Sequence, residues 1–105
     1  MKRLCTALTI ASFSALLPGA SFAQSNAELV QQFRTGFERG CNQGQTMGVR
    51  DQKGYCSCMA NSFQSRFSGL ELSAISESAS ALGDQGPAII NLMMAPEAKA
   101  CIAKY

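Results

Sequence analysis

Five cysteines are the residues of this chain whose type and spacing could do chemistry: Cys5, Cys41, Cys56, Cys58 and Cys101. Two of them lie in the short motif Tyr55-Cys56-Ser57-Cys58. Cysteine thiols form disulfides, exchange electrons or bind soft metal ions. Which of these applies depends on the compartment in which the chain folds and on the elements that position the cysteines.

The first 23 residues have the pattern of a secretory signal peptide. Lys2 and Arg3 give a positive start, an uncharged apolar stretch follows, and Ser-Phe-Ala at positions 21–23 is a typical cleavage site. The apolar stretch is shorter than the about 20 residues that a membrane span requires. We therefore predict a signal peptide over 1–23 and a single exported domain over 24–105, periplasmic or secreted, with no membrane attachment after the leader is removed.

Removal of the leader takes Cys5 away and leaves an even set of four cysteines, which predicts a small domain held by two disulfides. Residues two apart in a helix point about 200° away from each other, so we exclude a bond between Cys56 and Cys58. Two pairings remain: 41–56 with 58–101, or 41–58 with 56–101. We favour the second, because Cys56 shares an apolar stripe with Met59 and Phe63 that we expect to meet the last helix.

Apolar residues recur at helical spacing through the mature chain, and no segment alternates as a half-buried strand would. We predict an all-α fold, a small bundle of four or five short helices stapled by two disulfides. The expected helices cover 27–39, 53–67, 68–82, 87–94 and a last segment from about Pro96 to the end of the chain.

Local residues predict where several of these helices begin and end. Asn26 and Asp51 are expected as N-caps, and Ser68 with Glu71 forms a capping box. Gly40 and Gly83 are expected to end their helices. The third helix should bury a stripe of apolar residues, namely Leu72, Ile75, Ala79 and Leu82.

Glycines at 36, 40, 44 and 48 are spaced as in a membrane glycine zipper. That motif requires an apolar helix in lipid, whereas the residues between these glycines are polar or charged. We interpret the segment as the end of a helix followed by a long polar loop over 42–54.

The composition argues against an enzyme. The chain has no histidine, so the usual Ser-His, Cys-His and zinc sites are excluded. The seven acidic residues are scattered, and without Lys2 and Arg3 seven basic residues balance them. A neutral surface lacks the charge that drives nucleic-acid binding. We expect no enzymatic activity, no cofactor and no nucleic-acid partner.

Two functional alternatives use the sulfur atoms. Cys56 and Cys58 could form a reducible dithiol near a helix start, which would make the protein a thiol-redox factor. Cuprous copper suits thiolate and thioether ligands, and the mature chain carries Met47, Met59, Met93 and Met94. Because three of these methionines have packing explanations and there is no Met-x-x-Met cluster, we expect no metal site.

The best indication of an interaction surface is an apolar run near the C-terminus. A short helix that is hydrophobic on nearly every side is either central to the domain or covered by another molecule. We predict a possible surface for a protein partner formed by Ile89, Ile90, Leu92, Met93 and Met94. The predicted function is that of a non-enzymatic protein-binding module.

The cysteine frame resembles that of a loose group of small exported bacterial proteins whose function is unassigned. The shared elements are a Cys after an amphipathic helix, a Tyr-Cys-x-Cys start to a second helix, a Ser-x-x-Glu-Leu start to a third, and a late Cys. Here they are Cys41, 55–58, 68–72 and Cys101. The resemblance implies a helical architecture and no particular activity.

Overall fold

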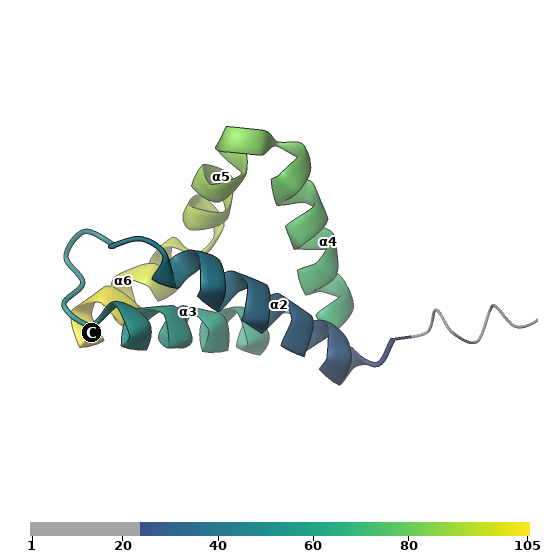
Figure 1. The fold of residues 1–105 in the computed structure, drawn as a ribbon, viewed down its shortest axis with the longest axis horizontal. Coiled ribbons are helices and arrows are strands. Elements are labelled where there is room, and N and C mark those ends of the chain that lie inside the picture. The colour runs from purple at the N-terminus through teal and green to yellow at the C-terminus, as the bar shows by residue number, and fades with distance from the viewer. Residues whose placement is uncertain (1–23) are drawn as a thin grey trace, which may run out of the picture.

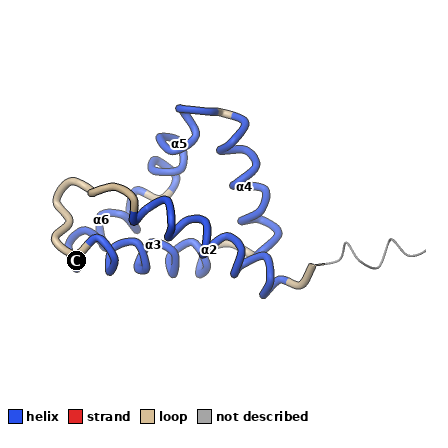
Figure 2. The backbone as a smooth tube through the Cα atoms, in the orientation of Figure 1, coloured by secondary structure: helices blue, strands red, loops and turns tan. Residues whose placement is uncertain are grey.

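The computed structural model describes residues 24–105, and every regular element in that range is a helix (Figures 1 and 2). The elements are α2 (Asn26–Asn42), α3 (Gln52–Arg66), α4 (Gly69–Ala81), the 3-10 turn η2 (Gly83–Gln85), α5 (Gly86–Met93) and α6 (Ala95–Lys104). The predicted all-α fold of short helices with two disulfides is confirmed. The predicted signal peptide and Cys5 lie outside the described residues.

Local capping places three helix ends as the sequence predicts. The Asp51 carboxylate accepts a hydrogen bond from the backbone N–H of Gly54 at the start of α3. Ser68 and Glu71 form the expected capping box of α4. Gly83 follows the end of α4 with a φ of 59°, a left-handed conformation that glycine adopts without strain.

The start of α2 differs from the prediction. Its N-cap is Ser25, which forms a capping box with Glu28, rather than Asn26. The side-chain oxygen of Asn26 instead accepts a hydrogen bond of 2.6 Å from the backbone N–H of Gly69. Asn26 therefore ties the first turn of α4 to the first turn of α2.

Helix α3 is the centre of the packed body. It lies against α2 on one side and against α6 on the other. Cys56, Met59 and Phe63 of α3 are at most 4% exposed. Leu72 of α4 and Met94 before α6 complete the core, and neither is exposed to solvent.

Helices α4 and α5 stand away from this body as a hairpin closed by η2 (Figure 1). The root of α4 packs on α2, and α5 returns to α6. Leu72, near the root, is fully buried, whereas Leu82, at the tip, is 45% exposed. The predicted apolar stripe is therefore wrong at Leu82, because α4 leaves the body before that residue.

The loop between α2 and α3 lies beside the C-terminal end of α6 (Figure 2). The carbonyl oxygen of Tyr105 accepts hydrogen bonds from the backbone N–H groups of Arg50 and Asp51, at 2.9 and 2.8 Å. The loop is thereby fixed at its second end. No helix among the described residues has the length and apolar content to cross a membrane.

Gly86 sets the close approach of α5 to α4. A Cβ atom at this position would overlap the backbone carbonyl of Ala79, which cannot move aside as a flexible side chain could. We expect Gly86→Ala to separate the two helices and to lower the free energy of unfolding by about 1–3 kcal/mol. Urea denaturation followed by circular dichroism measures the change, and Gly36→Ala, where a Cβ meets nothing within 4 Å, is the control. Equal stability of both variants would contradict this account.

Candidate functional site

The four cysteines of the described chain form two disulfides. Cys41 at the end of α2 is bonded to Cys56 in α3, and Cys58 in α3 is bonded to Cys101 in α6. The prediction that Cys56 and Cys58 are not bonded to each other is confirmed. The favoured pairing of 41–58 with 56–101 is wrong, because the stripe of Cys56 and Phe63 faces α2 and leaves Cys58 turned toward α6.

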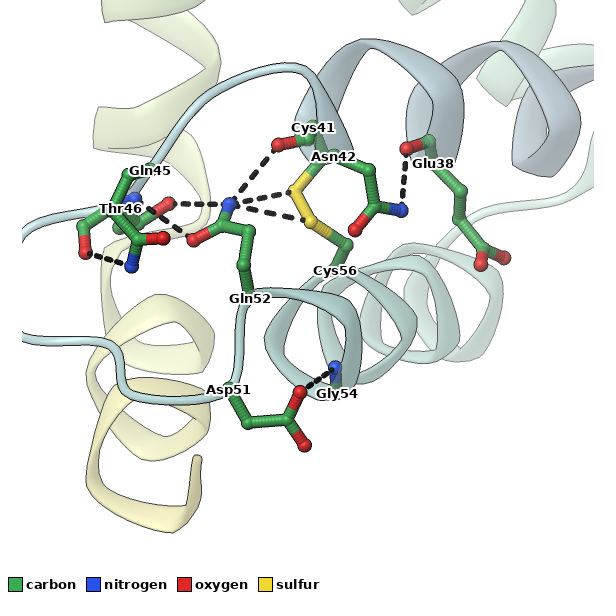
Figure 3. The surroundings of a disulfide bond; sticks show 9 residues. All are labelled: Glu38, Cys41, Asn42, Gln45, Thr46, Asp51, Gln52, Gly54 and Cys56. Atoms are coloured by element: carbon green, nitrogen blue, oxygen red, sulfur yellow. Dashed lines mark hydrogen bonds between the residues drawn. A yellow bond between two sulfur atoms is a disulfide. The ribbon is translucent and has the colours of Figure 1, made fainter.

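The side-chain amide of Gln52 connects the Cys41–Cys56 disulfide to the loop between α2 and α3 through hydrogen bonds (Figure 3). Its Nε2 donates hydrogen bonds to the carbonyl oxygen of Cys41 at 3.0 Å and to Oγ1 of Thr46 at 2.9 Å, and it lies 3.4 Å from Sγ of Cys56. Its Oε1 accepts from the backbone N–H of Thr46 at 2.8 Å. Sequence reasoning missed this residue, since no local motif marks it.

A cleft of about 520 Å³ opens between α2 and α5. Within residues 24–105, α5 packs against α4, η2 and α6 but not against α2. A space therefore remains between α5 and α2 (Figure 1). The volume lies within the range of about 300–1,000 Å³ typical of small-molecule sites. The cleft is lined by Phe33, Gly36, Phe37, Gly40, Cys41, Gly44, Gln45, Thr46, Gln52, Tyr55, Met59, Phe63, Ala79, Pro87, Ile90, Asn91 and Met94.

Aromatic rings and thioethers form much of this lining. The Phe63 ring lies 5.0 Å from that of Phe33 and 5.2 Å from that of Phe37, measured between centroids. Met59 and Met94 line the cleft beside them, and both are almost fully buried. No charged side chain lines the cleft. The site therefore suits an apolar, uncharged molecule.

Three glycines line the α2 side of the cleft without an evident internal reason to be glycine. Gly36 and Gly40 lie inside α2, which continues to Asn42 rather than ending at Gly40 as predicted. A Cβ atom at Gly36, Gly40 or Gly44 would meet nothing within 4 Å, and none of the three has a positive φ. Each glycine inside a helix costs about 1 kcal/mol relative to alanine. Gly36 and Gly40 therefore leave this side of the cleft open at a cost in helix stability, whereas Gly44 lies in the loop after α2.

Tyr55 places a polar group in this apolar lining. The residue is 8% exposed and lines the cleft, yet its hydroxyl makes no hydrogen bond to any group in the described part of the chain. Burial raises the pKa of the Tyr55 phenol above its ordinary value, so the hydroxyl keeps its proton at neutral pH.

The five residues of the predicted partner surface differ in their exposure to solvent. Ile89 and Leu92 are 45% and 78% exposed, Ile90 and Met93 are partly buried, and Met94 is fully buried in the core. Including Met94 in that surface was wrong, because it packs under the junction of α5 and α6. A second, shallower groove of about 290 Å³ lies between α4 and α5, and Ile89, Ile90 and Met93 contribute to it.

The sulfur-based alternatives gain no support from this arrangement. Cys56 and Cys58 are bonded to different helices, so the dithiol that the redox hypothesis requires is not formed by these disulfides. Met59 packs in the core, as its packing explanation predicts, and Met47 is 92% exposed in the loop.

Comparison with known proteins adds no assignment. No family model matches this chain. Neither the curated proteins nor the solved structures contain a significant match. The function must therefore be argued from the cleft, the hairpin and the disulfides alone.

Proposed function

We propose that this protein is an exported, non-enzymatic binding domain that recognises a protein partner through its α4–α5 hairpin. The observation that carries the proposal is the location of the exposed apolar side chains. Of the five large hydrophobic residues exposed in the described chain, four lie on the hairpin: Leu70 in the first turn of α4, and Leu82, Ile89 and Leu92 at its tip and on α5. Exposed apolar residues gathered on one element mark an interaction site more often than scattered ones.

The groove between α4 and α5 gives this surface a shape. It is lined by Ile75, Leu82, Ile89 and Met93 among others, and no charged residue contributes to it. Such a groove suits an apolar segment of a partner, whose side chains would enter it while Leu92 contacts the partner beside it. Charge would contribute little to this recognition.

Export is proposed on two grounds. The first is the leader pattern of residues 1–23. The second is the presence of two disulfides in a domain this small, which is typical of oxidising compartments. Both disulfides connect α2, α3 and α6, so they rigidify the body that carries the hairpin.

Charged substitutions at the two exposed apolar positions of α5 test the proposal. We expect Leu92→Glu and Ile89→Glu to leave the melting temperature nearly unchanged, because exposed carboxylates remain hydrated. Both should reduce capture of the partner from an envelope extract of the host at least about tenfold, since a carboxylate would be desolvated in an apolar contact. Photo-crosslinking from position 92 identifies the captured protein.

Leu70→Glu is the matched control, because Leu70 is 73% exposed on α4 away from the groove. It should retain capture. If Leu92→Glu retained capture as well as Leu70→Glu, the hairpin would not be the recognition surface.

A further inference from the structure

We propose that the cleft between α2 and α5 binds a small, uncharged amphiphile, with an apolar chain or ring against Phe33, Phe37 and Ile90 and one polar group at Tyr55. This site shares Ala79 and Ile90 with the α4–α5 groove but lies on the other side of α5 from Leu92, and it goes beyond the protein recognition proposed above. It would give the domain a second ligand, held on the opposite side of α5 from Leu92.

The character of the ligand follows from the lining. The partly exposed rings of Phe33 and Phe37 and the side chain of Ile90 offer dispersion contacts to a hydrocarbon, above a floor of buried Phe63, Met59 and Met94. No lysine or arginine lines the cleft to neutralise an acid, and no aspartate or glutamate lines it to neutralise an amine. A charged head group would lose its hydration without gaining a counter-ion. The ligand is therefore neutral.

The glycines indicate that the ligand approaches the backbone of α2. Gly36 and Gly40 lie one turn apart in α2 and face open space, so they form a smooth strip along the cleft, which Gly44 of the following loop also lines. From Phe33 to Cys41 this strip follows about 12 Å of helix. An extended chain or a flat ring system lying on the strip would contact the backbone where larger side chains would block it.

Tyr55 supplies the polar end. Its side chain is more than nine-tenths buried, and no group in residues 24–105 pairs with its hydroxyl. A hydroxyl both donates and accepts, so it would bind an alcohol, an ester or an amide.

Displacement of the uncharged dye Nile red from the purified, oxidised protein provides the test. Three competitors of equal chain length differ only in their head group: decanol, decanoate and decylammonium, with decanol used below its solubility limit and the two ions below their micelle concentrations. We expect decanol to displace the dye with at least about tenfold higher affinity than either ion. Equal affinity for all three would overturn the proposal, because it would indicate general adsorption to apolar surface. Absence of dye and decanol binding would overturn it too.

Two substitutions locate the site. Gly40→Leu fills the cleft, and because a Cβ there meets nothing within 4 Å, the variant should fold with an equal or higher melting temperature. It should weaken decanol binding at least about tenfold. Thr35→Leu, on an exposed face of α2 outside the cleft, is the matched control and should bind normally. Gly36→Leu replaces Gly40→Leu if the latter fails to fold. If the folded glycine-to-leucine variant bound decanol as tightly as the wild type, the proposal would be wrong.

Tyr55→Phe separates the polar contact from the apolar one. It should weaken decanol binding about 2–12-fold while leaving the affinity for Nile red unchanged. Leu92→Glu, which tests the hairpin, should change neither affinity, so failure of one proposal does not imply failure of the other. Equal decanol affinity of Tyr55→Phe and the wild type would remove Tyr55 from the site.

Discussion

Replacing both Cys58 and Cys101 with alanine is expected to lower the free energy of unfolding by about 4 kcal/mol. The disulfide joins residues 43 positions apart, so its loss frees a long segment in the unfolded chain. A small domain has about 5–15 kcal/mol in total, so most of the stability could be lost. Urea denaturation at neutral pH under non-reducing conditions measures the change. Alanine is used rather than serine because position 101 is 1% exposed, and a serine there would bury an unpaired hydroxyl.

The Cys41–Cys56 disulfide provides the comparison. Its residues are only 15 positions apart, so the corresponding double alanine variant should lose about 3 kcal/mol. Removal of the Cys58–Cys101 disulfide should also destabilise α6 more than the other helices. Helix α6 packs only on α3 and α5 among the described helices, and its amides should lose hydrogen-exchange protection first. A larger loss from removing Cys41–Cys56 would contradict the chain-entropy argument.

The helices and their ends could be predicted because the signals are local. The four-residue spacing of Leu29, Phe33 and Phe37 indicates a helix without knowledge of its neighbours. Capping at Asp51 and Ser68 likewise depends on residues within one turn. The cap of α2 also has a local signal, the Ser25-x-x-Glu28 pattern, whereas the adjacent Asn26 makes a contact with α4 that no local pattern predicts.

The disulfide pairing could not be decided from the sequence because it depends on which helix meets which face of α3. Cys56 and Cys58 lie on different faces, and either face could have met α2. The cleft was missed for the same reason. Its lining comes from α2, α3, the tip of α4, α5 and the loop, and only the glycine spacing of α2 was visible in advance. That spacing was interpreted as a helix end, whereas Gly36 and Gly40 lie within the helix.

Neither disulfide reaches the α4–α5 hairpin, so the proposed partner surface and the α5 side of the cleft are not covalently cross-linked to the body. Leu72 is a principal contact, since it is the residue of α4 whose large side chain is fully buried. Movement of α4 at its root would carry α5 away from the cleft. The stability of this root is therefore expected to control ligand access as well as folding.

Leu72→Ala is expected to lower the free energy of unfolding by about 2–5 kcal/mol, through lost burial and the cavity left behind. Leu70→Ala, two residues earlier in the same helix and 73% exposed, should change it by no more than about 0.5 kcal/mol. Alanine suits helices, so the comparison isolates burial from helix propensity. Because the disulfides retain α2, α3 and α6, hydrogen exchange should accelerate in α4 and α5 of Leu72→Ala before it does in α3. Uniform acceleration in all helices would instead show that the hairpin and the body unfold as one unit, and that the cleft cannot open without global unfolding.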